Sequence, residues 1–186
     1  NAIYGGTGEY AQPLHEEIFE LLINSGADLK VKDNDQTPLD CAILILHKDK
    51  YKVTSDDSFY VDILCKHGCT PSTIHVAAIG GFIEVVKEFL ETGTNVDAKN
   101  KYGQTPLHMA LAARFLSKKH QKIAELLINS GADMIATDNS GATPFHHAVA
   151  HECWELAELF IQKGTDVNAK YPCIDYDKRS WTSLHL

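Results

Sequence analysis

The 186-residue sequence lacks any apolar run of the roughly 18 residues that a helix needs to cross a bilayer. It also lacks an excess of basic residues, since 17 Lys and Arg stand against 25 Asp and Glu and the net charge is −8 at pH 7. A nucleic-acid-binding surface would need a local basic stripe against this acidic field, and none is evident. We therefore expect neither insertion into a membrane nor a nucleic-acid partner.

Cysteine pairs and catalytic motifs are missing as well. The five cysteines form no CxxC motif, and an odd number does not suit a disulfide framework, which favours a reducing intracellular compartment such as the cytoplasm. No glycine-rich phosphate loop follows a strand, and neither G-x-S-x-G nor H-E-x-x-H occurs. We therefore expect no enzyme activity, no catalytic residues and no cofactor.

What the sequence does contain is a short phrase that recurs along its whole length. The clearest copy is Thr105-Pro106-Leu107-His108-Met109-Ala110. Relatives of this phrase begin at Thr37, Ser72, Thr143 and Thr182. Five occurrences in one chain indicate a repeat protein, in which each repeat is one small structural unit.

Each copy of the phrase predicts the start of a short helix. The Thr105 side chain can accept from the unpaired amides of a helix start, and Pro106 fits the first helical position because its missing N–H costs nothing there. Leu107, Ala110 and Leu111 then form an apolar stripe, with small alanines that allow a neighbouring helix to come close.

A second block predicts the end of a second helix in each unit. Residues 20–28 and 125–133 are identical, and weaker copies end at Gly68, Gly93 and Gly164. Their apolar residues repeat at helical spacing, and the glycine suits a left-handed helix cap. The chain from this glycine to the next phrase is polar and turn-forming. We therefore expect each unit to be a helix, a turn, a second helix and an extended finger.

A single helix pair cannot bury its apolar stripe alone, so neighbouring pairs must cover it and the core must run lengthwise. At this point the sequence resembles the ankyrin repeat family, whose T-P-L-H-x-A signature and period of about 33 residues match the spacing of 33 between Ser72 and Thr105. The resemblance implies an all-α solenoid of stacked helix-turn-helix units with connecting hairpin fingers. We expect one array over residues 1–186, with units at about 1–33, 34–70, 71–99, 100–137, 138–170 and a partial 171–186.

Both ends of the sequence resemble interrupted repeats. Asn1-Ala2-Ile3-Tyr4 matches the end of a first helix, and residues 182–186 match only the opening of a further repeat. We therefore expect the chain to be part of a longer array, with apolar faces uncovered at its ends. The alternative is that terminal residues are simply absent from the sequence.

Three repeats carry additional residues between their two helices. The distance from the alanine of the phrase to the helix-ending glycine is 16 residues in two compact units, but 24, 26 and 21 residues in the other three. The additions contain two basic stretches, residues 46–52 and 114–120, which either extend the helices by about a turn or form projecting loops.

The fingers vary in length as well. The gap of four between residues 68 and 72 is too short for a hairpin tip, so the next phrase could open a fresh sub-array. The finger over residues 164–182 is six residues longer than the ordinary finger of 12. Aromatic residues and arginine at an exposed tip are typical of binding hot spots, which makes Tyr176, Arg179 and Trp181 candidate contacts. The alternative is that its aromatic side chains pack back on the last helix pair.

The histidines of the phrase have a structural role in the family that the sequence resembles. That role is to hydrogen-bond within and between neighbouring hairpins. The resemblance therefore implies it for His75, His108, His146 and His185.

A metal site is a hypothesis for a second group, His147, His151, Glu152 and Cys153, because two imidazoles four residues apart on a helix could bind one metal ion. Alignment with the compact repeat places Glu152 at the end of the first helix, which breaks that geometry. We therefore expect no metal.

The resemblance implies protein binding rather than catalysis. In the family, the recognition surface is the concave side, made by the finger tips and the exposed side of each first helix. Carried over by position, this predicts contacts at Asn34, Gln36, Leu44, Lys101, Tyr102, Gln104, Ala112, Ala113, Asn139, Ser140, Ala142, Ala150 and His151. We expect a monomer that binds another protein by rigid docking, which costs little ordering entropy. Tyr102 is the strongest single candidate.

A structural spacer is the competing hypothesis. In that role the chain would only separate other domains of a longer protein, or stack on them through its exposed ends. Only a binding module would capture a partner that is lost when Lys101 and Tyr102 are replaced by alanine.

Overall fold

The computed structural model describes residues 20–33, 35–46, 57–113, 117–151, 153–168, 170–172 and 180–182. Residues 20–24 are helical. The elements that follow are α2 (Pro38–Leu46), α3 (Asp57–Lys66), α4 (Ile74–Ile79), α5 (Ile83–Glu91), α6 (Pro106–Leu111), α7 (Lys118–Asn129), α8 (Pro144–Ala150), α9 (Trp154–Gln162), β1 (Lys170–Pro172) and β2 (Ser180–Thr182). None of the helices in these ranges is long and apolar enough to cross a membrane.

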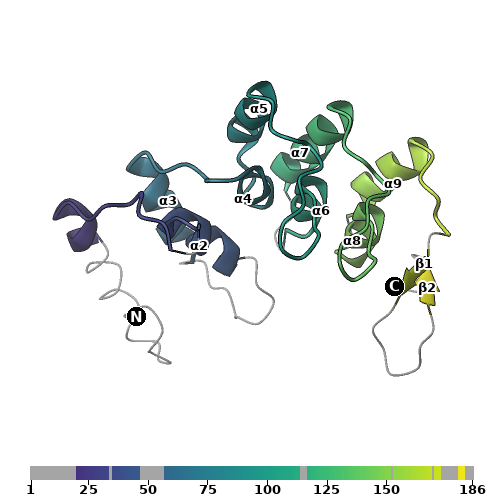
Figure 1. The fold of residues 1–186 in the computed structure, drawn as a ribbon, viewed down its shortest axis with the longest axis horizontal. Coiled ribbons are helices and arrows are strands. Elements are labelled where there is room, and N and C mark those ends of the chain that lie inside the picture. Colours follow the sequence, from purple (N-terminus) through teal and green to yellow (C-terminus); the bar gives the residue numbers. More distant parts are fainter. Residues whose placement is uncertain are drawn as a thin grey trace.

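The helices form two stacked rows. Figure 1 shows an inner row of α2, α4, α6 and α8 and an outer row of α3, α5, α7 and α9. In the inner row α4 packs against α6 and α6 against α8, while in the outer row α5 packs against α7 and α7 against α9. Two extended fingers, residues 92–105 and 130–143, project on the side of the inner row (Figure 1). The predicted helical solenoid with connecting fingers is confirmed.

The starts of the inner helices follow the predicted chemistry. Thr105 is the N-cap of α6, where its side chain accepts the backbone N–H of His108, and Pro106 occupies the first turn. Thr143 and Pro144 begin α8 in the same way. The inner helices therefore begin where the recurring phrase places them.

Glycine ends the outer helices. Gly93 and Gly131 have φ angles of +83° and +89°, a backbone conformation that costs glycine little and other residues more. After α5, the N–H of Thr94 reaches back to the carbonyl oxygen of Phe89 at 3.0 Å, which is the hydrogen bond of a Schellman cap. The predicted helix ends are confirmed.

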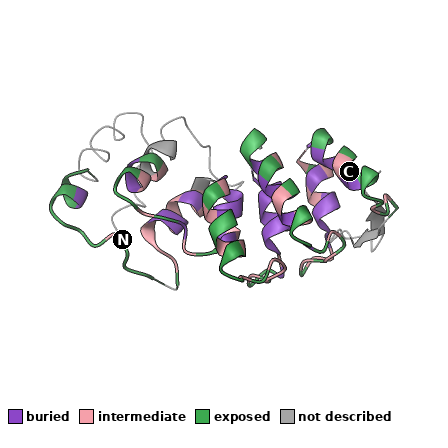
Figure 2. Ribbon diagram, turned by 90° about the horizontal axis from the view of Figure 1, so that it is seen from above, coloured by how far each residue is buried: buried purple, intermediate pink, exposed green. Residues whose placement is uncertain are grey.

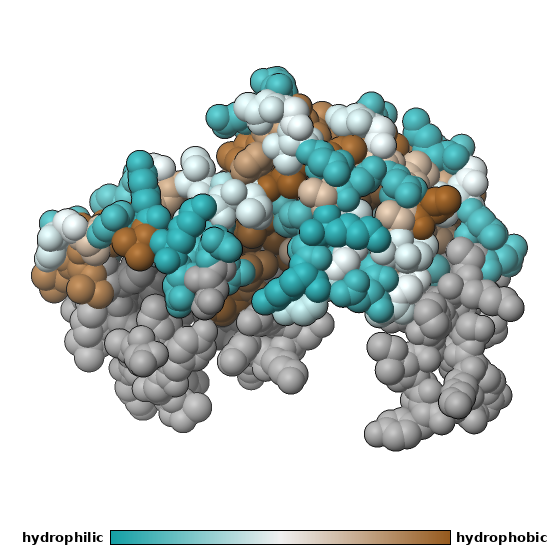
Figure 3. Space-filling model, in the orientation of Figure 1, coloured by the Kyte–Doolittle hydropathy of each residue, from teal (hydrophilic) through white to brown (hydrophobic). Residues whose placement is uncertain are grey.

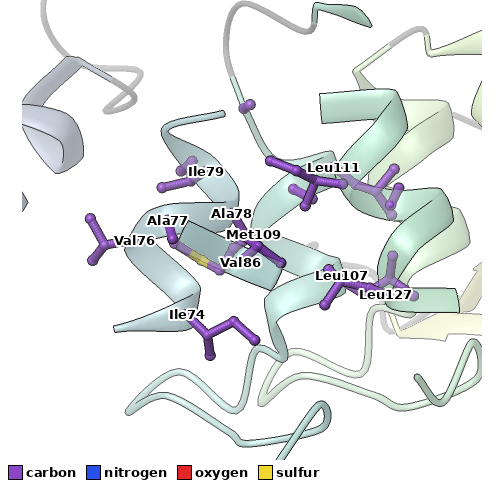
Figure 4. Close-up of a cluster of buried hydrophobic side chains, with 14 of the residues drawn as sticks. Ile74, Val76, Ala77, Ala78, Ile79, Val86, Leu107, Met109, Leu111 and Leu127 are labelled. Carbon is purple, nitrogen blue, oxygen red and sulfur yellow. The ribbon is translucent and has the colours of Figure 1, made fainter. Parts of the chain in front are cut away.

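The apolar core runs between the two rows. Leu107, Leu111 and Leu127 are fully buried, and Figure 4 shows Leu107 of α6 beside Leu127 of α7. Figure 2 shows the buried residues concentrated in α4 to α9. Burial of this kind contributes about 25 cal/mol per Å² of apolar surface, so the stacking of pairs holds the array together.

Two departures from the regular unit are visible, one in the last finger and one before α7. The long last finger contains an antiparallel strand pair, with Tyr171 of β1 opposite Trp181 of β2. The insertion before α7 partly lengthens that helix, which has 12 residues against 9 in α5 and in α9. Residues 114–116 of this insertion, and residues 47–52 of the other basic stretch, lie outside the described ranges.

The outer row is interrupted between α3 and α5. Helix α2 packs against α4, but α3 and α5 form no comparable contact. Only residues 67–73 connect α3 to α4, and they contain no finger, as the short spacing predicts. The array therefore changes its packing at this connection.

Candidate protein-binding surface

Histidine links the inner helices α4 and α6 to the fingers that follow them. Nε2 of His108 lies 3.1 Å from the carbonyl oxygen of Ala142. Because a carbonyl oxygen only accepts, this nitrogen carries the proton, and Nδ1 accepts the backbone N–H of Thr105 at 3.1 Å. Burial lowers the pKa of His108 from its ordinary 6.5 to about 4, so the imidazole is neutral at neutral pH. His108 thus ties α6 to the second finger.

His75 makes the same link one unit earlier. Its Nε2 lies 2.7 Å from the carbonyl oxygen of Ala98 and 3.1 Å from that of Gln104. These two carbonyls stand on opposite sides of the first finger, so one N–H group holds both of them.

The family role of the phrase histidines is therefore confirmed for His75 and His108. In the next unit, Nδ1 of His146 accepts the backbone N–H of Thr143 at 3.1 Å, which is the local part of the same pattern. His185 lies outside the described residues.

Asp138 holds the tip of the second finger in shape. One carboxylate oxygen accepts the backbone N–H groups of Ser140 at 2.8 Å and Ala142 at 3.0 Å, and the hydroxyl of Ser140 at 2.6 Å. The other oxygen lies 3.2 Å from Nε2 of His147. Partial burial opposes ionisation of Asp138, but the hydrogen bonds from Ser140, His147 and Ala142 outweigh it and lower the pKa of this carboxyl.

The two fingers are joined to each other. The backbone N–H of Asn139 donates to the carbonyl oxygen of Tyr102 at 2.9 Å, and its side-chain amide donates to that of Lys101 at 3.2 Å. Nearer the helices, Nζ of Lys99 donates to the carbonyl oxygen of Thr137 at 2.9 Å. Neighbouring tips are therefore fixed relative to one another before any partner arrives.

Tyr102 stands out from this rigid tip, with 59% of its surface exposed. Nζ of Lys101 lies 5.2 Å from the centroid of the Tyr102 ring, within the range of a cation–π interaction. Asn139 is exposed beside them, and Gln104 and Ser140 are partly exposed. The structure thus brings five predicted contacts together, which we call the fingertip surface: Lys101, Tyr102, Gln104, Asn139 and Ser140.

The predicted contacts at the ends of α6 and α8, together with Ala142 of the second finger, divide into two groups. Ala112 is partly exposed, Ala150 is exposed, and His151 is partly buried. By contrast, Ala113 is 0% and Ala142 4% exposed. Ala113 joins the apolar core, and Ala142 is drawn inward by the histidine link to its carbonyl. Neither side chain is available to a partner, so these two predictions are wrong as direct contacts.

The remaining predicted contacts lie away from the fingertip surface or are not described. Gln36 and Leu44 are partly buried, and Leu44 packs against the core. Trp181 is placed only by its backbone in β2, and Asn34, Tyr176 and Arg179 lie outside the described residues.

The second group of histidines contains a stacked pair, His147 and His151. The rings of His147 and His151 are nearly parallel, with centroids 6.4 Å apart. Burial lowers the pKa of His147 although the hydrogen bond to Asp138 opposes the shift. Helix α8 ends at Ala150, and Glu152 lies outside the described residues. Across the described ranges, no three His, Cys, Asp or Glu side chains have the arrangement of a metal site.

Sequence analysis missed one further histidine link. Nδ1 of His120 accepts the backbone N–H of Ser117 at 3.2 Å, and its Nε2 donates to the carbonyl oxygen of Ile79 at 2.9 Å. This link ties α7 to the end of α4. The spacing from Ser117 to His120 equals that from Thr105 to His108, which is the signal that could have identified it.

Paired helices, linking histidines and projecting fingers define a helical repeat solenoid. A profile of ankyrin repeats (3 copies) matches residues 53–138 and 74–171, which together cover more than half of the chain. The chain belongs to the ankyrin repeat family. Ankyrin repeats are generally protein–protein interaction modules and are typically non-catalytic.

Several characterised proteins are similar to this chain. Ankyrin repeat and SOCS box protein 16 of Homo sapiens is 36% identical over 181 residues, with coverage of 77% of this chain and 39% of that protein. The Nuclear factor NF-kappa-B p105 subunit of Gallus gallus is 29% identical over 163 residues, with coverage of 83% of this chain and 15% of that protein. Protein phosphatase 1 regulatory subunit 27 of Homo sapiens is 32% identical over 108 residues, with coverage of 58% of this chain and 65% of that protein. The chain spans less than half the length of the first two.

Proposed function

We propose that this chain binds another protein through the fingertip surface and the adjoining inner helices, without catalysis. Tyr102 is the observation that carries the proposal, because its ring is 59% exposed while its backbone is held by Asn139. A large aromatic side chain on an ordered backbone supplies contact area at little cost in ordering entropy.

The groups around Tyr102 suit a protein partner. Lys101 brings a positive charge beside the ring, and Gln104, Asn139 and Ser140 bring neutral polar groups. An aromatic anchor with a polar rim is the usual composition of a protein interface. A partner would therefore bury the Tyr102 ring and form hydrogen bonds around it.

A reducing intracellular compartment fits this function. Cys65 and Cys69 are partly exposed, and like the buried Cys153 they are free thiols. Exposed free thiols persist where disulfide formation is suppressed. This placement is part of the proposal.

The test is affinity capture from a lysate of the source organism with mass-spectrometric identification. Wild type is compared with the Lys101→Ala/Tyr102→Ala variant and with Ile135→Ala, a matched control because Ile135 is 67% exposed but lies outside the fingertip surface. We expect a protein that binds wild type and Ile135→Ala and is lost with the double variant. Melting temperatures should agree within a few degrees, since the replaced side chains are exposed.

A spacer would behave differently. It would capture no protein that depends on Lys101 or Tyr102, and the double variant would match wild type. That result would reject the fingertip surface as a binding site.

A further inference from the structure

The insertion before α7 adds one turn to the start of that helix. Helix α7 begins 13 residues before its helix-ending glycine, Gly131, whereas α5 and α9 each begin 10 residues before theirs. The added residues are Lys118, Lys119 and His120. Measured from the glycines, α7 therefore starts one turn earlier than the outer helix on either side of it.

A buried histidine fixes the added turn to the end of α4. His120 is 6% exposed, and its Nε2 donates to the carbonyl oxygen of Ile79 at 2.9 Å. Gly81 follows α4 with φ +76°, and a Cβ built on it would lie 3.6 Å from Cβ of Lys119. The backbone of this turn is therefore held against α4, so its exposed side chains start from fixed positions and lose less freedom when they bind.

Three lysines share one face at the start of α7. Lys118 and Lys122 are four residues apart and Lys119 and Lys122 are three apart, so all three are neighbours on the helix surface. Their side chains are exposed, and none of them forms an ion pair with a described residue. We call Lys118, Lys119 and Lys122 the lysine face of α7.

No carboxylate of the described residues pairs with the lysine face. Helices α4 and α6, which pack against α7, contain no Asp or Glu. On α7 itself the first carboxylate is Glu125, one turn beyond Lys122. The two neighbouring outer helices do carry exposed glutamates, Glu84, Glu88, Glu91, Glu155 and Glu158. Of these, Glu84 pairs with Lys87 of its own helix, and none lies within 4.0 Å of a lysine of the face.

The lysine face and the fingertip surface lie at opposite edges of the array. Helix α6 starts at the first finger, after Thr105, and α7 starts beyond the far end of α6. Figure 2 shows the fingers along one edge of the array, and Figure 3 shows hydrophilic side chains over them. A partner of the lysine face therefore needs no contact with Tyr102.

We propose that the lysine face of α7 binds a short segment rich in Asp and Glu in a partner protein. Charge complementarity selects this occupant, because three unpaired lysines stand together at a helix start, where the helix dipole also favours negative charge. The backbone N–H groups of Lys118 and Lys119 form no hydrogen bond with a described residue, so they too can donate to a carboxylate. The lysines span about 6 Å along the helix axis, which fits a few carboxylates.

Nucleic acid and anionic membranes are poorer occupants. Both present an extended negative surface, which the rest of this chain repels because its net charge is −8. Apart from the buried His120, α7 also has no aromatic side chain on which a base could stack. A short acidic segment can reach the lysine face without approaching the acidic remainder of the chain.

The experiment is an amide chemical-shift titration of the 186-residue chain at low salt. The probe is a synthetic peptide of about ten residues in which Glu alternates with Gly, matched to a peptide with Gln in place of every Glu. We expect the Glu peptide to shift the amides of Lys118, Lys119 and Lys122, and the Gln peptide to shift none of them. Because the chain as a whole is acidic, overall attraction does not produce this binding.

Neutralising the lysines tests which residues bind. Lys118→Gln/Lys122→Gln should weaken binding of the Glu peptide by about tenfold. Lys66→Gln/Lys163→Gln removes the same charge from exposed lysines at the ends of α3 and α9, and should alter affinity by no more than about twofold, because salt screens distant charges. Glutamine has nearly the helix propensity of lysine, so both variants should fold like wild type.

The fingertip variant keeps the two surfaces apart. Lys101→Ala/Tyr102→Ala should bind the Glu peptide as wild type does, because the two surfaces lie at opposite edges. The lysine face and the fingertip surface can therefore fail or succeed independently.

Several results would overturn the proposal. Equal weakening by the two glutamine variants, or shifts centred on Tyr102, would place the peptide elsewhere. Unshifted amides of the lysine face at about 1 mM peptide would show that the three lysines are only solvated. Duplex DNA or phosphatidylserine vesicles that shift these amides at lower concentration than the peptide would assign the lysine face to nucleic acid or to a membrane.

Discussion

The carboxylate of Asp40 accepts a hydrogen bond from the backbone N–H of Ser72 at 2.9 Å, across 32 residues of sequence. Asp40 stands at the position of the phrase that His75 and His108 occupy in later units. Those imidazoles donate to carbonyl oxygens of the finger that follows. No finger lies between residues 68 and 72, so the backbone N–H of Ser72 takes the place of the finger carbonyl. The carboxylate of Asp40 accepts this N–H, where a histidine would donate to a carbonyl oxygen.

The first prediction is that Asp40→His destabilises the protein by about 1–3 kcal/mol. Asp40 is 0% exposed and also accepts the backbone N–H of Thr37 at 2.8 Å. A neutral imidazole has a single acceptor nitrogen, so it cannot satisfy both Thr37 and Ser72. Urea unfolding measures the loss, and faster hydrogen exchange at the Ser72 amide locates it. Asp62→Ala is the control, since Asp62 is exposed on helix α3. Unchanged exchange at Ser72 would contradict the assigned bond.

Asp40 also shows how far sequence reasoning reaches. The phrase Thr37-Pro38 correctly predicts where α2 starts, because the capping chemistry is local. The short spacing between residues 68 and 72 correctly predicts a missing finger. The link between these two facts depends on which backbone group points at residue 40, and that direction is set by packing between units. A pattern of residue types along one chain does not contain it.

The second prediction concerns pH. His108 has a pKa of about 4 in the folded protein against an ordinary value of 6.5, so the unfolded chain takes up a proton first as pH falls. Stability that depends on neutral His108 is complete above pH 6.5, declines between pH 6.5 and 4, and amounts to about 3 kcal/mol in total. Burial also lowers the pKa values of His75 and His120, which adds to the decline.

Urea unfolding at pH 7.5, 6 and 5 would measure this decline. In the His108→Gln variant one titrating group is removed, so its free energy of unfolding should fall less steeply with decreasing pH than that of wild type. Parallel slopes for the two proteins would mean that His108 does not contribute to the pH dependence.

The third prediction uses two glycines that share a backbone conformation but not their surroundings. Gly103 has φ +73°, and a Cβ built on it would overlap Oδ1 of Asn139 and lie 2.8 Å from the backbone N of that residue. Gly131 has φ +89°, and a Cβ there would meet nothing within 4 Å. In both alanine variants the left-handed backbone conformation lowers the free energy of unfolding by about 1–2 kcal/mol. Only in Gly103→Ala must the new Cβ also push Asn139, and with it the second finger, away from the first.

We therefore expect Gly103→Ala to be the less stable variant and to lose protection of the Asn139 amide in hydrogen exchange. If the fingertip surface binds a partner, Gly103→Ala should also weaken capture, because Tyr102 is no longer held in place. Equal stability of the two variants would show that the fingers adjust without cost.

The binding surface was less predictable from sequence than the helices. Lys101 and Tyr102 were identified by position in the repeat, and both are exposed at the tip. Ala113 and Ala142 were selected by the same rule and are buried, because repeat position fixes the backbone but not the path of an irregular loop. The insertion that follows Ala113 is a feature of this chain rather than of the repeat, and the carbonyl of Ala142 is engaged by the histidine link from His108.

The fourth prediction compares two identical nine-residue segments, 20–28 and 125–133. Leu127 in the second is 0% exposed, whereas its counterpart Leu22 is 56% exposed. Leu127→Ala should therefore cost about 2–5 kcal/mol in free energy of unfolding, and Leu22→Ala less than about 1 kcal/mol. Since local sequence and helix propensity are the same at both sites, the difference measures tertiary cover alone. Urea unfolding of both variants gives the comparison, and a large cost at Leu22 would mean that another part of this protein covers the first unit.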